Sequence, residues 1–66
     1  MNKIFLEQIK YCRKHRGITL EELSNKTGIS KAYLSRLENG GKINPSLIIL
    51  EKIANVLQVE LTFLIK

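Results

Sequence analysis

The feature that most constrains the fold of this chain is Gly28, which stands between two short segments that carry helix signals. Glycine adopts the left-handed conformation found just beyond many helices, which residues with side chains resist. Upstream, Thr19 and Glu22 bracket the sequence TLEE, a capping box in which each side chain satisfies a backbone N–H of the other residue. Downstream, Ser30 has a side chain favoured at helix N-caps. These signals predict a helix from Thr19 to about Lys26, ending at Thr27-Gly28, and a second helix from Ser30 to Asn39.

Apolar spacing predicts a helix before this pair, from roughly Lys3 to Arg16. Phe5, Ile9 and Cys12 recur at intervals of four and three residues, which places them on one helical face. Gly17 then ends the helix.

Two more helices are predicted after the glycine pair Gly40-Gly41. Residues 42–44 form a loop, and Pro45 lies at or just before the start of a helix, where its missing N–H costs little. A short helix from Leu61 to Ile65 follows it. Because no segment alternates apolar and polar residues for long, we expect a single all-α domain of five helices spanning residues 1–66. The longer helix carries a buried stripe of Leu47, Leu50, Ile53, Ala54 and Leu57.

Composition narrows the classes of function. The 66 residues are 44% hydrophobic, enough for one small core. The apolar runs are far shorter than the roughly 20 residues of a membrane span. Cys12, the single cysteine, cannot form an internal disulfide and is expected to be buried, which fits the reducing cytoplasm. One His, one Cys and six Glu without any Asp do not assemble a metal site or a nucleophile–base pair, so we expect no enzyme activity, no metal and no cofactor.

The charge of the chain favours an anionic partner. Eleven Lys and Arg against six acidic residues give a net charge of +5. Nucleic acid and an anionic membrane surface both attract such a chain. The membrane surface is disfavoured, because no helix pairs a large apolar face with a Lys-rich opposite face.

The helix after Gly28 has two unlike sides. At about 100° per residue, Leu34 and Leu37 point inward and Tyr33 lies at the edge of that arc. The opposite arc is polar or small, and the methyl group of Ala32 can touch a thymine methyl. Arg36 and Lys31 can donate to guanine. The opposite arc consists of Lys31, Ala32, Ser35, Arg36 and Asn39.

Two interpretations of this helix pair remain open. A helix about 10–12 Å in diameter fits the major groove, about 12 Å wide, so the pair suits a helix-turn-helix in which the second helix reads bases. Alternatively, the pair is a helical hairpin within a small bundle, and its polar face only meets water.

The motifs RGIT, GIS, YLSRLENG and NPS, with LEKIANVLQV, resemble the Cro/Xre family of phage-repressor-like helix-turn-helix domains, and most of all its SinR-type regulators. The resemblance runs from about Phe5 to Ile65. It implies a compact five-helix, lambda-repressor-like domain. It also implies a transcriptional regulator, expected to be a repressor, that binds two-fold symmetric operator sites on double-stranded DNA as a homodimer. An interaction module of the same fold, such as an antitoxin with a protein partner, is the alternative.

The resemblance also assigns roles by position. Base reading falls to Lys31, Ala32, Tyr33, Ser35 and Arg36, and contacts with the DNA backbone fall to Thr19, Ser30, Asn39, Lys42 and Asn44. Arg13 and Glu38 match a buried ion pair between the first and third helices. Two residues depart from the family pattern. Leu20 replaces a glutamine that bonds phosphate, and Ser24 replaces a small alanine where two helices cross, with a hydroxyl able to bond a carbonyl one turn back.

The C-terminal segment holds more apolar residues than a five-residue helix can bury on its own domain. Phe63 and Ile65 are candidate dimer contacts, with Leu61 and Ile49 beside them. The alternative is that these residues complete the core. The apolar end fits either a minimal regulator or a larger protein cut at a domain boundary.

Overall fold

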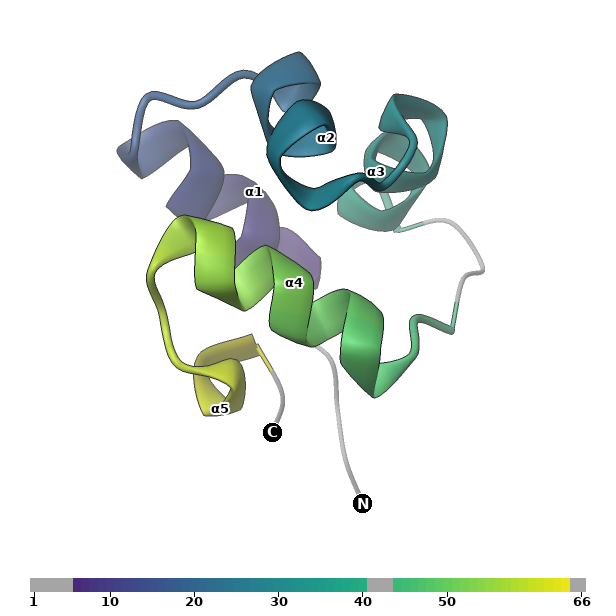
Figure 1. Ribbon diagram of the computed structural model, residues 1–66. Helices are drawn as coiled ribbons and strands as arrows, with labels where there is room; N and C mark the ends of the chain where they lie inside the picture. Colours follow the sequence, from purple (N-terminus) through teal and green to yellow (C-terminus); the bar gives the residue numbers. More distant parts are fainter. Residues whose placement is uncertain (1–5, 41–43, 65–66) are drawn as a thin grey trace.

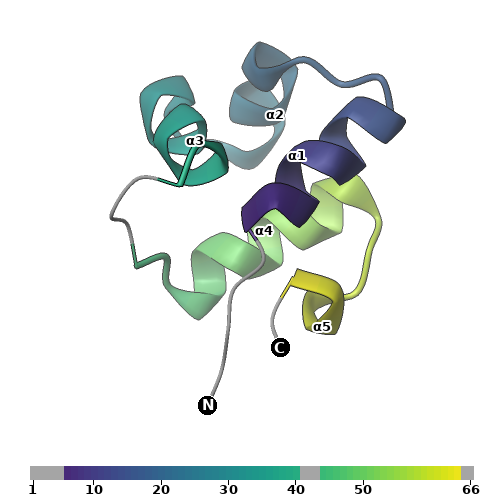
Figure 2. The ribbon, with the colours of Figure 1, turned by 180° about the vertical axis from the view of Figure 1, so that it is seen from behind.

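The computed structural model describes residues 6–40 and 44–64 and contains only helices within them. The all-α, five-helix prediction is confirmed. Helices α2 and α3 lie together at one end of the molecule, and α5 lies at the opposite end (Figure 1). Seen from behind, α1 passes in front of α4 between these two ends (Figure 2). The helices are α1 (Leu6–His15), α2 (Leu20–Thr27), α3 (Lys31–Glu38), α4 (Leu47–Leu57) and α5 (Leu61–Leu64).

The caps around Gly28 form as predicted. The Thr19 hydroxyl accepts from the Glu22 N–H at 3.1 Å, and the Thr19 N–H donates to the Glu22 carboxylate at 2.9 Å. Gly28 adopts the left-handed conformation with φ of 77°, and its N–H donates to the Ser24 carbonyl. The Ser30 hydroxyl accepts from the Tyr33 N–H at 3.1 Å, which starts α3. Strictly local signals therefore define both ends of the turn.

Four helix ends differ from the predictions or lie beyond the described residues. Helix α1 ends at His15, one residue before Arg16, and its predicted start at Lys3 lies outside the described residues. Helix α3 ends at Glu38, with Asn39 as its C-cap. The predicted end of α5 at Ile65 also lies outside the described residues.

The predicted apolar stripe of α4 is wrong at its first residue. Leu47 is 56% exposed, whereas the other four stripe residues are buried. The first turn of α4 extends past the helices that cover its middle (Figure 1), so apolar periodicity alone does not bury it. The start of this helix is defined by Ser46, whose hydroxyl accepts from the Ile49 N–H at 3.2 Å. This cap was not predicted, although serine directly before an apolar run is an N-cap signal.

Every helix contributes to one core. Its fully buried side chains include Ile9 of α1, Leu23 of α2 and Leu64 of α5. Cys12 is buried as predicted, and desolvation raises the pKa of its thiol. Helix α3 is anchored by Leu34 and Leu37, both 0% exposed. Burial of each leucine stabilises the fold by about 1.5–3 kcal/mol, so this anchoring leaves only the other side of α3 available to a partner.

Candidate nucleic-acid interface

The outer face of α3 combines exposed cations with small side chains. Lys31, Ala32 and Arg36 are exposed, opposite the buried leucines. Tyr33 and Ser35 are half-buried, and Tyr33 packs partly against the core. The five residues assigned to base reading thus share one helix, but only three of them are fully open to a partner.

This face carries no free carboxylate. Glu38, the only acidic residue of α3, is turned into the protein, and its side chain is 3% exposed. Its carboxylate pairs with Arg13, so its charge is neutralised away from the surface. Neither Lys31 nor Arg36 has a salt-bridge partner within residues 6–40 and 44–64. The accessible side of α3 is therefore positively charged, which suits a polyanion.

The Arg13–Glu38 pair has the bidentate geometry of a strong ion pair. Arg13 Nε donates to Glu38 Oε2 at 2.7 Å, and Arg13 Nη2 donates to Oε1 at 2.9 Å. A third donor, Nη1, reaches the Ile18 carbonyl at 2.9 Å. The hydrogen bonds to Glu38 raise the pKa of the Arg13 guanidinium. The pair joins α1 to the end of α3, as the family resemblance implied.

Two N-cap hydroxyls remain able to donate. Thr19 and Ser30 use their oxygens as acceptors for backbone N–H groups, and in the described part of the chain neither hydroxyl donates, so each can donate to a phosphate oxygen. The site at Thr19 carries an electrostatic cost. Hydrogen bonds from Thr19 hold the pKa of Glu22 below its usual value, so this exposed carboxylate stays charged beside any phosphate.

The first residue after α3 forms hydrogen bonds with the last turn of that helix. Asn39 Nδ2 donates to the Ser35 carbonyl at 2.8 Å and lies 3.4 Å from the Ser35 hydroxyl. The amide oxygen of Asn39 accepts no hydrogen bond from residues 6–40 and 44–64, and the residue is exposed. Asn44 is exposed as well. Lys42 lies outside the described residues.

Ser24 bonds across the turn rather than back along its own helix. Its hydroxyl donates to the Ile29 carbonyl at 2.6 Å, whereas the sequence suggested a carbonyl one turn earlier. The chain reverses at Gly28 and brings Ile29 over α2, so the carbonyl ahead is closer in space. Only the folded turn supplies this acceptor.

The residues assigned to the dimer interface separate into two groups. Phe63 is 44% exposed and remains accessible. Leu61 and Ile49 pack partly against the core, as the alternative interpretation proposed, and Ile65 lies outside the described residues. Ile48, next to Ile49, is 65% exposed.

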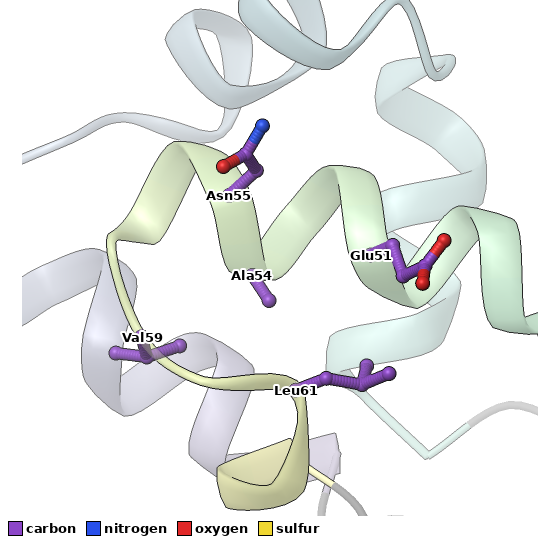
Figure 3. Close-up of a pocket in the computed structure, with 5 residues that line it drawn as sticks. All are labelled: Glu51, Ala54, Asn55, Val59 and Leu61. Atoms are coloured by element: carbon purple, nitrogen blue, oxygen red, sulfur yellow. The ribbon is translucent and has the colours of Figure 1, made fainter.

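A shallow hollow of about 290 Å³ lies between α4 and the start of α5 (Figure 3). Leu61 and Val59 come from the α5 side, and Ala54, Glu51 and Asn55 from α4. Its lining combines one carboxylate and one amide with three apolar side chains.

Other kinds of site are not found in the described part of the chain. No three His, Cys, Asp or Glu side chains within residues 6–40 and 44–64 gather as a metal site would require. Over the same residues, none of the helices combines the length and apolarity needed to cross a bilayer.

Comparison with known proteins places these features among DNA-binding regulators. The helix-turn-helix family model HTH_3 matches residues 9–64. The HTH-type transcriptional regulator SinR of Bacillus subtilis (strain 168) is 45% identical over 53 residues, covering 80% of this chain and 48% of that protein. The chain therefore spans about half the length of this relative.

Two solved structures share the fold closely. The crystal structure of SinR, the master regulator for biofilm formation, in complex with DNA aligns with a TM-score of 0.85 at 42% identity, covering 89% of this chain and 94% of that one. The complex of SinR with the SinI protein gives the same TM-score and identity, and there the alignment covers 57% of the matched chain.

Proposed function

Because this chain belongs to the helix-turn-helix family, as its motifs predicted, we propose that it is a DNA-binding transcriptional regulator that reads the major groove with α3. One observation carries the proposal: Lys31, Ala32 and Arg36 are exposed on a helix whose only carboxylate is buried. The relative SinR is named a transcriptional regulator and has been solved in complex with DNA, which supports the same role here. Such a protein acts at the bacterial nucleoid in the cytoplasm, and repression is the expected outcome of operator binding.

Within this proposal, some side chains contact base edges and others contact phosphates. Arg36 and Lys31 donate to guanine edges, and Ala32 allows close approach to a thymine methyl. Tyr33 and Ser35, which are half-buried, add contacts at the edge of the helix. The hydroxyls of Thr19 and Ser30 and the amides of Asn39 and Asn44 fix the protein on the phosphates, together with Lys42.

A selection experiment tests this function directly. The 66-residue chain is incubated with a pool of random duplexes at low salt, and the bound DNA is sequenced after several rounds. We expect a two-fold symmetric consensus with half-sites about one helical turn apart, because one helix in one groove binds weakly and pairing is needed. A pool that shows no enrichment, with no retarded duplex at micromolar protein, would refute the proposal.

Arg36→Ala is expected to weaken binding to the selected site more than binding to random duplex. A bidentate arginine–guanine contact discriminates by about 1–3 kcal/mol, so specific affinity should fall by about 5–150-fold, with a small common loss from the missing charge. Titrations of both duplexes by fluorescence anisotropy measure the ratio. Lys52→Ala, which removes an exposed charge from α4, is the control. Equal losses on the two duplexes would assign Arg36 to phosphate.

Phe63→Glu is expected to shift the monomer–dimer balance toward monomer. The change places a charge on an exposed apolar side chain that we assign to the dimer contact, and burying an unpaired charge is costly. Sedimentation velocity over a concentration series measures the shift. Tyr11→Glu alters another exposed aromatic residue, on α1, and should leave the balance as in the parent. An unchanged balance in Phe63→Glu would remove this residue from the interface.

Regulation through a protein partner is the second candidate function. SinR has been solved with the SinI protein, and this chain exposes the apolar residues Leu47, Ile48 and Phe63. An electrophoretic mobility shift assay with random duplex at low salt separates the two functions. A chain whose main role is partner binding would leave random duplex unshifted at low salt.

A further inference from the structure

Side-chain hydroxyls of α2 hold the turn that leads into α3. Thr27 Oγ1 donates to the Leu23 carbonyl at 2.7 Å and accepts from the Ile29 N–H at 3.2 Å. Ser24 Oγ donates to the Ile29 carbonyl at 2.6 Å. Both backbone polar groups of Ile29 are therefore bonded to side chains of the preceding helix, and the Ile29 side chain is itself 7% exposed.

Gly28 does not provide this rigidity. No neighbouring atom lies within 4 Å of the position that a Cβ on Gly28 would occupy, so packing does not define its conformation. The glycine permits the turn, and the two hydroxyls select one geometry for it. Ile29 directly precedes Ser30, the N-cap of α3, so its backbone orientation sets the direction in which α3 leaves the turn.

We propose that Ser24 and Thr27 are positioning residues for DNA reading, because their hydroxyls fix α3 in the orientation that aligns Lys31 and Arg36 with base edges. This inference rests on the proposed function. Bidentate contacts with bases need accurate alignment, whereas phosphate contacts carry no sequence information and depend less on it. Loss of a hydroxyl should therefore lower sequence specificity before it lowers affinity for random DNA.

Ser24→Ala tests the inference on the 66-residue chain. One net hydrogen bond can bias the orientation of α3 only by its own free energy, so affinity for the selected duplex should fall by about 2–10-fold. Affinity for random duplex should stay within about twofold, since Lys31 and Arg36 are still present. In the free protein, residual dipolar couplings of the α3 amides relative to those of α1 should change, which a loss of stability alone does not cause.

Ser46→Ala is the matched control, because it deletes a serine hydroxyl from the N-cap of α4 and leaves the α2–α3 turn intact. It should leave the ratio of specific to random affinity as in the parent. At Thr27, a second pair of variants distinguishes the effect of the hydroxyl from the effect of side-chain shape. Thr27→Val keeps the shape and loses the hydroxyl, and its ratio should fall, whereas Thr27→Ser keeps the hydroxyl and should preserve the ratio.

The possible results have distinct meanings. A folded Ser24→Ala with the parental ratio and parental couplings would overturn the positioning role while the proposed function stands. A parent chain that enriches no sequence would overturn the proposed function, and that result is obtained without any variant. A lowered ratio in Ser24→Ala and Thr27→Val, but not in Ser46→Ala or Thr27→Ser, supports the positioning role.

Discussion

Replacing Glu38 with alanine is expected to lower the free energy of unfolding by about 3–5 kcal/mol, because it leaves the Arg13 guanidinium without its partner. The Arg13 side chain is 11% exposed and the Glu38 side chain 3%, so water cannot fully replace the lost carboxylate. A domain of 66 residues has a total stability of about 3–10 kcal/mol, so the substitution should remove at least about a third of it. Urea unfolding followed by circular dichroism measures the change.

Two further variants distinguish the lost pair from the lost charge. Glu51→Ala removes an exposed carboxylate from α4, and its stability should stay within about 0.5 kcal/mol of the parent. The double variant Arg13→Met, Glu38→Leu should recover much of the loss, because apolar side chains replace a buried ion pair at little cost. A single Glu38→Ala variant that unfolds at the parental urea concentration would contradict a structural role for the pair.

Binding to DNA is expected to weaken about 10³–10⁵-fold between 50 and 200 mM salt, if the dimer neutralises about 6–10 phosphates. Each neutralised phosphate releases counterions, and this release becomes less favourable as salt rises. The exposed Lys31 and Arg36 are the first contributors on α3, because the buried Glu38 does not screen them. Affinities for the selected duplex across a series of salt concentrations measure the slope.

Lys42→Ala should reduce the slope of log affinity against log salt by about one for each protomer, since one charge that we assign to phosphate is lost. Lys52→Ala should leave the slope close to the parental value if the outer face of α4 stays away from DNA. A parental slope near zero would contradict phosphate binding altogether, whatever sequence the protein prefers.

The sequence alone determined where the helices around the turn begin and end, and which side of α3 faces outward. The caps at Thr19 and Ser30 and the left-handed Gly28 depend on atoms within four residues along the chain, so local chemistry decides them. The inward direction of Leu34 and Leu37 follows from helical periodicity in the same way.

Tertiary structure alone decided the contacts between segments distant in the chain and the exposure of helix ends. Leu47 continues the apolar period of α4, yet its side chain is exposed at the beginning of that helix. Arg13 and Glu38 lie 25 residues apart, and only the packing of α1 against α3 brings their charges together. Periodicity and capping describe each helix separately, whereas these features depend on how the helices are oriented in space.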